Sequence, residues 1–164
     1  MSYMDKSTIS IRRAVSGDLE ALEAARGASV QAETGWPALF SFSLGNHLEA
    51  PGIFTYLAED EHPFGFVTVG GCELDLAEGE IFEWFLRKEY QQSTYGRRLL
   101  VHGLSVLKRR QCESVLIWLP APAARAREVL VRQGFEDSGA TRERNGAEDT
   151  IIDAGFIRDL SDYF

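Results

Sequence analysis

The chain has 164 residues, with 17 lysines and arginines against 25 aspartates and glutamates, a net charge of −8 at pH 7 and a hydrophobic content of 45%. This composition predicts a folded protein, most simply one domain over residues 1–164, and excludes a disordered chain. The acidic balance argues against nucleic acid as a partner, and without an apolar leader or an apolar run of membrane-spanning length we expect a cytoplasmic protein with no membrane partner.

The cysteines and histidines give no sign of a disulfide framework or of a metal site. Cys72 and Cys112 lie far apart in the sequence, and two free thiols fit a reducing compartment. His47, His62 and His102 are scattered without the spacing that metal ligands show. We therefore expect no disulfide and no bound metal.

Periodic patterns in the first half of the chain predict a strand, two helices and a hairpin. The expected elements are a strand at residues 8–13, a helix at 16–27, a helix at 37–50, and paired strands at 53–58 and 64–69. Ser16 is the expected N-cap of the first helix, and Pro37 the first residue of the second. Gly70 and Gly71, which follow the hairpin, predict a bulge or a bend.

The second half of the chain predicts a central strand with a crossover helix, followed by a helix and a hairpin. Residues 80–86 carry bulky apolar side chains on both faces, which is typical of a strand in the middle of a sheet. The elements expected after it are a helix at 97–110, a strand at 114–119, a helix at 123–133, and strands at 135–142 and 149–156. The tail, residues 157–164, has three open alternatives: docking on the body, docking on a second subunit of a homodimer, or fraying.

The turn between the central strand and its helix predicts an anion site. The first N–H groups of a helix have no intrahelical acceptor, and the helix dipole places partial positive charge there. Residues 87–110 contain seven basic residues and one acidic residue, a balance of +6, so the rest of the chain carries −14. Arg97 and Arg98 strengthen the positive field, and the small residues of the turn let backbone approach a phosphate.

Residues 91–96, Gln-Gln-Ser-Thr-Tyr-Gly, resemble the Gln/Arg-x-x-Gly-x-Gly/Ala signature of the GNAT superfamily of acyl-coenzyme A-dependent N-acyltransferases. Gln91 matches its first position and Gly96 its last, whereas Thr94 replaces the middle glycine. A threonine at positive φ is strained, so the turn either departs from the family's shape or stores strain. The order of elements along nearly the whole chain also resembles this family. The implied fold is a mixed, mostly antiparallel sheet with a splayed parallel strand pair and about four helices.

The resemblance also implies where acetyl-coenzyme A binds. The turn's backbone amides would hold the pyrophosphate, and the splay between the strands at 80–86 and 114–119 would expose backbone groups that pair with the pantetheine arm. The residues implied to bind the coenzyme are Trp84, Phe85 and Leu86 of the strand, and Gln91, Gln92, Ser93, Thr94, Tyr95, Gly96 and Arg97 of the turn.

Two features of the family are missing from this sequence. Leu130 stands where many members have a tyrosine that protonates the leaving thiolate, and an asparagine common before that helix is replaced at or near Ala123. Tyr90, Tyr95 or a water molecule could supply the proton instead. The loss also raises the alternative that the protein binds an acyl-coenzyme A without turning it over.

Two carboxylates of the central strand are the candidate catalytic residues. Glu80 lies eleven residues before Gln91, which resembles the placement of the general base in histone-type members of the superfamily. Glu83 is the second candidate, and strict alternation would put it on the other face of the strand. The competing interpretation is that both are partly exposed residues near strand ends.

The sequence therefore predicts an enzyme that transfers an acetyl group from acetyl-coenzyme A to a primary amine by direct attack. We expect the acceptor to be cationic, because acidic residues dominate the rest of the chain and the run at Glu73, Asp75 and Glu78 precedes the candidate bases. Trp36, Phe40 and Phe42 are expected in the core, although the segment between the first two helices lines the acceptor cleft in this family.

Overall fold

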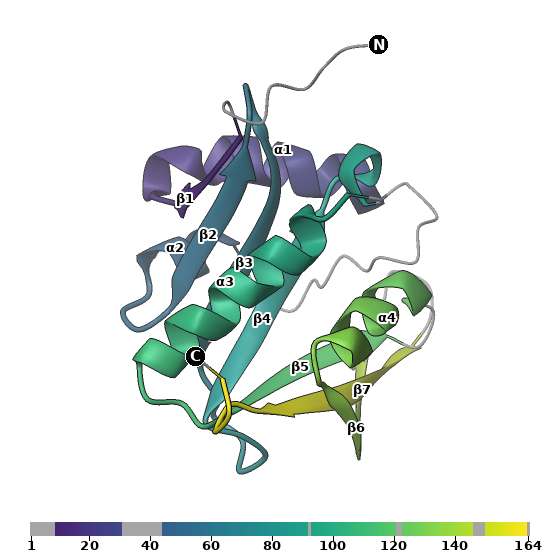
Figure 1. Cartoon of the computed structure of the whole chain (residues 1–164). Helices are drawn as coiled ribbons and strands as arrows, with labels where there is room; N and C mark the ends of the chain where they lie inside the picture. The colour runs from purple at the N-terminus through teal and green to yellow at the C-terminus, as the bar shows by residue number, and fades with distance from the viewer. Residues whose placement is uncertain (1–8, 31–43, 92, 121–122, 146–149, 164) are drawn as a thin grey trace.

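The computed structural model describes residues 9–30, 44–91, 93–120, 123–145 and 150–163 (Figure 1). Its strands are β1 (Ser10–Arg13), β2 (Phe54–Glu59), β3 (Pro63–Gly71), β4 (Gly79–Leu86), β5 (Ser114–Pro120), β6 (Glu136–Asn145) and β7 (Thr150–Asp159). Its α-helices are α1 (Leu19–Val30), α2 (Leu44–Glu49), α3 (Tyr95–Arg109) and α4 (Ala124–Arg132). Of the helices within these ranges, none has the length and apolar character needed to cross a membrane.

The seven strands form one sheet in the order β1-β2-β3-β4-β5-β7-β6. Neighbouring strands run antiparallel except for β4 and β5, which are parallel and are connected by α3. β4 is the fourth strand of seven, which confirms the prediction of a central strand from its apolar residues on both faces. The predicted fold class, a mixed and mostly antiparallel sheet with one parallel pair, is confirmed.

The parallel pairing between β4 and β5 is short. It joins Gly79, Glu80 and Ile81 to Val115, Leu116 and Ile117, and it stops there, although β4 continues to Leu86 and β5 to Pro120. The two strands diverge beyond this point, and Figure 1 shows them separating between α3 and α4. The predicted splay is therefore present, and its vertex lies at Ile81 and Ile117.

Helices cover both faces of the sheet and bury two separate cores. On one face α3 presents leucines 99, 100, 104 and 107, each at most 1% exposed, to the strands. The 3.6-residue spacing of these leucines is what predicted the helix, and each buried side chain contributes roughly 1.5–3 kcal/mol. On the other face α1 packs Leu22 and Ala25 against β2, β3 and β4. The central strands are thus held from both sides.

A β-bulge interrupts the pairing of β3 with β4. Thr68 pairs with Glu83 but Val69 pairs with Ile81, so Phe82 is an extra residue on β4. Of the two alternatives predicted at Gly70 and Gly71, a bulge or a bend, the bulge is wrong, because both glycines keep regular partners on β4. A bulge shifts the side-chain alternation by one residue, and here it falls directly beside the vertex of the splay.

Several element boundaries differ from those predicted. α3 begins at Tyr95 rather than Arg97, a 3₁₀ helix (Lys88–Tyr90) occupies part of the predicted turn, and β7 extends through Asp159. The tail beyond β7 docks on the body, because Leu160 is fully buried and the Tyr163 hydroxyl donates to the Val101 carbonyl at 3.3 Å. The expectations for Trp36, Phe40, Phe42, Phe164 and most of the second helix lie outside the described residues.

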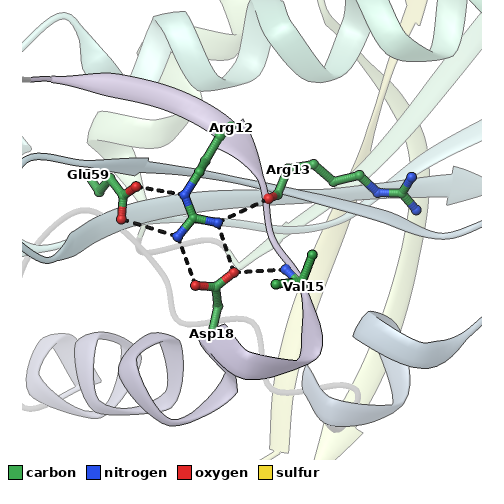
Figure 2. A network of polar contacts seen from close by, with 5 residues as sticks. All are labelled: Arg12, Arg13, Val15, Asp18 and Glu59. Carbon is green, nitrogen blue, oxygen red and sulfur yellow. Dashed lines mark hydrogen bonds and ion pairs between the residues drawn. The ribbon is translucent and has the colours of Figure 1, made fainter.

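A polar network fastens the sheet edge to the start of α1 (Figure 2). Arg12 of β1 donates to Asp18 at 2.8 and 3.0 Å and to Glu59 of β2 at 2.6 and 3.3 Å. Asp18 also accepts the Val15 N–H at 2.8 Å, so the N-cap of the first turn is Val15 rather than Ser16, and Asp18 binds it as in a capping box. The hydrogen bond from Arg12 lowers the pKa of the Asp18 carboxyl.

We expect Asp18→Asn to lower the free energy of unfolding at pH 7 by about 1 kcal/mol, because it weakens the cap and removes the charge that Arg12 faces. A carboxyl with a lowered pKa stabilises the fold above its ordinary value of 3.8, and this contribution disappears as the pH falls through the lower folded value. Urea unfolding of both proteins should therefore converge in strong acid. Asp162→Asn, which removes a 75% exposed partner of Arg158, is the matched control and should change little. A constant difference across the pH range would contradict this account.

Candidate active site

A cavity of about 580 Å³ lies beside the vertex of the splay, on the sheet face opposite α3. Four strands, α2 with the region after it, and the connection between β3 and β4 contribute to its walls. The lining residues are Asn46, Ala50, Pro51, Gly52, Ile53, Gly71, Glu73, Leu74, Glu80, Phe82, Trp118 and Arg142. Most of the wall is apolar, so the few charged side chains in it decide how a polar ligand can be oriented.

Glu80 is the buried carboxylate of this cavity. It pairs with Leu116 of β5, one residue before the vertex, and its side chain is 8% exposed. Burial raises the pKa of the Glu80 carboxyl, while the Cys72 thiol, which donates to it at 3.4 Å, and the charge of Arg142 act in the opposite direction. A carboxylate with a raised pKa is suited to accept a proton near neutral pH.

Glu83 has a different environment, although it lies on the same face as Glu80. Its carboxylate pairs with Arg26 of α1 at 2.9 Å and is 2% exposed. The expectation that the two glutamates lie on opposite faces is wrong, because the extra residue Phe82 shifts the alternation between them. Glu83 therefore joins β4 to α1, and it does not line the cavity.

The turn before α3 is attached to β4 by two side-chain hydrogen bonds. The Gln91 amide donates to the Leu86 carbonyl at 2.9 Å, and the Trp84 indole N–H donates to the Gly96 carbonyl at 2.9 Å. All four groups are buried. The first and last positions of the sequence motif therefore hold the turn at the open end of the splay.

The turn reaches its helical conformation without strain at Thr94. This residue has φ −78° and ψ −3°, so the alternative of stored strain is wrong. The Ser93 hydroxyl accepts the Tyr95 N–H at 3.3 Å, and Tyr95 and Gly96 form the buried start of α3. Arg97 is exposed beside them, whereas Gln92 lies outside the described residues.

Trp84, Phe85 and Leu86, the strand residues expected to line the coenzyme arm, all follow the vertex on β4. Trp84 and Leu86 face the core under α3, and Phe85 faces the core under α1. The strand thus contributes side chains to both cores while its backbone runs along the splay.

The tyrosines considered as proton donors have other contacts. Tyr90 stacks on Phe64 with ring centroids 3.8 Å apart, and its hydroxyl donates to Asp60 at 3.2 Å. Burial, followed by the charge of Asp60, raises the pKa of Tyr90. Tyr95 packs edge-on against Phe64. Neither tyrosine lines the cavity.

The two positions that depart from the family pattern are apolar and buried. Leu130 of α4 is fully buried, and Ala123, which precedes α4, is 3% exposed. Both belong to the core that α3 and α4 share with the sheet. They stabilise the packing of α4 and cannot donate a proton.

Arg142 and Trp118 are cavity residues that sequence analysis missed. The Arg142 guanidinium lies 4.9 Å from the centroid of the Trp118 ring and donates from Nε to the fully buried Asp153 at 2.9 Å. Gly155 leaves room for the indole, since a Cβ there would lie 3.0 Å from Trp118 Cζ3. These residues come from β5, β6 and β7, and only the strand pairing brings them beside Glu80.

Comparisons with solved structures show the same fold in bacterial acetyltransferases. A probable acetyltransferase from Staphylococcus epidermidis superposes with a TM-score of 0.75 at 15% identity, covering 93% of this chain and 99% of that one. The ribosomal-protein-S18-alanine N-acetyltransferase from Escherichia coli gives 0.71 at 16% identity, covering 93% and 94%. YncA, a putative acetyltransferase from Salmonella typhimurium solved with its cofactor acetyl-CoA, gives 0.72 at 18%, covering 95% and 96%.

The family comparison rests on sequence and agrees with the fold. No significant match was found among the curated proteins. The family model described as Acetyltransferase (GNAT) family matches residues 19–135, which include α1, the splayed strands, the turn, α3 and α4. The chain therefore belongs to the GNAT acetyltransferase family.

Proposed function

We propose that this protein is an acyl-coenzyme A-dependent N-acetyltransferase that moves an acetyl group from acetyl-CoA to a primary amine. One observation carries the proposal: the β4–β5 pairing stops at Ile81 and Ile117, with buried Glu80 beside the vertex. The turn that begins α3 lies at the open end of the same splay, and the cavity lies at its vertex. This order fits a long substrate whose reactive end meets an acceptor beside a base.

The coenzyme site in this proposal runs from the turn to the vertex. Arg97 and Arg98 are exposed at the N-terminus of α3, where the helix dipole also favours a phosphate. The diverging backbone edges of β4 and β5 would receive the amide-bearing arm in the manner of an added strand. YncA, which has the same fold, was solved with acetyl-CoA as its cofactor, and this supports the same ligand here.

The transfer needs only the amine and the thioester to react. The amine lone pair attacks the acetyl carbonyl carbon, a C–N bond forms, and the C–S bond breaks as its electron pair leaves with the sulfur. The acceptor arrives as an ammonium and loses two protons, one before the attack and one after it. One of these protons ends on the coenzyme A thiol, and the other is released to solvent. A thiolate is a good leaving group near neutral pH because thiols have pKa values of about 8.5.

Glu80 is the proposed general base, acting directly or through a water molecule. An alkylammonium with a pKa of about 10.4 must lose a proton before it attacks, and holding it neutral at pH 7 costs about 4.6 kcal/mol. Glu80 lines the cavity, is buried and has a raised pKa, whereas Glu83 is paired with Arg26. The geometry therefore favours Glu80 over Glu83 for this role.

The acceptor amine in this proposal is cationic when it approaches. Glu73 lines the cavity with Glu80, and the exposed residues Asp75 and Glu78 follow in the connection between β3 and β4. Acidic residues in a cavity and in the segment beside it raise the local concentration of ammonium groups.

The alternative function is an acyl-coenzyme A-binding protein that does not catalyse transfer. The observation that favours it is that Leu130 and Ala123 are apolar and buried, at two positions where many family members have polar residues. Release of coenzyme A thiol in the presence of an amine panel separates the two functions, because a pure binding protein releases none.

We expect acetyl-CoA to raise the melting temperature through the turn at the start of α3. A free ligand at a hundred times its Kd adds about 2.7 kcal/mol to the free energy of unfolding, which is several degrees for a protein of this size. Arg97→Glu with Arg98→Glu should remove most of this shift. The matched control reverses Arg109 and Arg110 at the other end of the same helix and should keep it. An equal loss in both variants, or no shift at millimolar acetyl-CoA, would contradict the proposed site.

Glu80→Gln should lower turnover by about 10²–10⁴-fold while acetyl-CoA binding persists, because the change removes the base and keeps its shape. The base must be deprotonated to act, so wild-type kcat/KM should rise with pH through the pKa of Glu80, which lies above its ordinary 4.5. The variant should lack this rise. Glu136→Gln, an exposed carboxylate of β6, is the control. Equal rates for Glu80→Gln and wild type at every pH would mean that bulk water deprotonates the amine.

Glu83→Gln should instead destabilise the fold, by about 3 kcal/mol in urea unfolding at pH 7, because it breaks a buried ion pair and deprives Arg26 of this countercharge. Glu80→Gln should cost little stability, since burial already disfavours the charged form of Glu80. Adding Arg26→Gln to Glu83→Gln should cost less than the sum of the single changes. A stable Glu83→Gln protein without activity would exchange the roles of the two glutamates.

A further inference from the structure

The cavity contains a cationic wall that the proposed base and coenzyme site do not use. Arg142 of β6 leans over the Trp118 ring of β5 and is held at Nε by Asp153 of β7. Arg142 and Trp118 both line the cavity, together with Glu80. A guanidinium stacked on an indole and fixed by a buried carboxylate has a defined orientation, which is the condition for selective binding of a planar anion.

The Arg142 guanidinium keeps free donors on this wall. Within the part of the chain that the structure describes, the Nη groups of Arg142 have no hydrogen-bond partner, and the side chain is 29% exposed. The indole Nε1 of Trp118 has almost no accessible surface, so Trp118 contributes its ring and not its N–H. A partly exposed guanidinium with free donors can form charge-assisted hydrogen bonds to the acceptor oxygens of a ligand.

The cationic wall and the carboxylate of Glu80 lie at different places in one cavity. The guanidinium lies above β5 at Trp118, two residues beyond the Leu116 partner of Glu80 on the neighbouring strand. Strand and residue spacings place the backbone positions of Glu80 and Trp118 on the order of 8 Å apart. Burial raises the pKa of Glu80, and the charge of Arg142 partly opposes this rise.

We propose that the acceptor is an amino acid, a primary amine that carries a carboxylate a few bonds away. Its ammonium end faces Glu80, and its carboxylate accepts hydrogen bonds from the Nη groups of Arg142. Leu74 and Phe82 give the remaining wall an apolar character that suits an apolar side chain. The proposal rests on the proposed acetyltransfer and names its substrate class. The product is the N-acetyl amino acid, whose carboxylate stays intact.

A purely cationic amine is the competing acceptor. Such a molecule is attracted by Glu73 and Glu80 but repelled by Arg142, and it leaves the donors on the cationic wall without acceptors. An amino acid satisfies both ends of the cavity. Matched acceptors that differ only in the carboxylate therefore separate the two classes.

The experiment measures kcat/KM for the common amino acids, for two β-amino acids, and for the carboxamide and the decarboxylated amine of the best substrate. Wild type should prefer the amino acid by about ten- to a hundredfold, the range expected for charge-assisted hydrogen bonds. Arg142→Gln should lose this preference, measured as the ratio of the two rates at a pH high enough to keep Glu80 ionised in both proteins, because the loss of the Arg142 charge also changes the pKa of Glu80. Trp118→Phe keeps an aromatic ring beneath Arg142 and should retain the preference.

A second variant separates the loss of carboxylate binding from a loss of stability. Arg142→Gln deprives the buried Asp153 of this countercharge, so Arg142→Gln with Asp153→Asn should recover the melting temperature and still lack the preference. Equal use of the amino acid and its carboxamide by wild type overturns the proposal. So does an Arg142→Gln variant that loses activity equally on all amines.

The acetyltransfer proposal and this one can fail separately. If wild type acetylates simple amines but shows no preference for amino acids, only the substrate class is wrong. If no amine is acetylated, calorimetry of the same amino acids with the coenzyme A-loaded protein still tests the cationic wall. Binding that depends on Arg142 then supports the amino acid site, and no binding overturns it.

Discussion

The early end of the hydrogen-bond ladder between β4 and β5 is the constraint on which the rest of the structure depends. Two parallel strands that stay paired have no place for a ligand between them, whereas these separate after Ile81 and Ile117. The α3 helix must still connect them, so its N-terminus and the turn before it lie at the open end. The turn, the splay and the cavity are consequences of one local change in pairing.

The bulge at Phe82 keeps both glutamates of β4 out of the core under α3. An unbroken β4 would direct Glu80 and Glu83 to opposite faces, and one of them would enter the leucine-rich core under α3. With the extra residue, both carboxylates lie on the sheet face of α1 and the cavity, where Glu83 pairs with Arg26 and Glu80 lines the cavity. A carboxylate in the leucine core would have had no countercharge.

The sequence predicts the elements whose periodicity is strong and misses the features that need tertiary pairing. The leucines of α3 and the bulky residues of β4 predict their helix and strand, and the motif at Gln91 predicts where the turn lies. No periodic signal marks the bulge, because one added residue looks like any other residue of a strand. Arg142 was missed for a related reason: it is one arginine in a hairpin, and only the strand order β4-β5-β7-β6 brings it to Glu80. The role of Glu80 remains a prediction from spacing and burial.

Gly155 is a position at which a substitution would change the size of the cavity. The residue does not line the cavity, yet it lies under Trp118, and any side chain there would meet the indole, Leu116 or Ser138 within about 3.3 Å. A methyl group at this position would press the ring forward and reduce the space above it. Homologues could therefore diverge in the size of molecule they accept through a position that never touches that molecule. A search for specificity determinants confined to the cavity lining would overlook it.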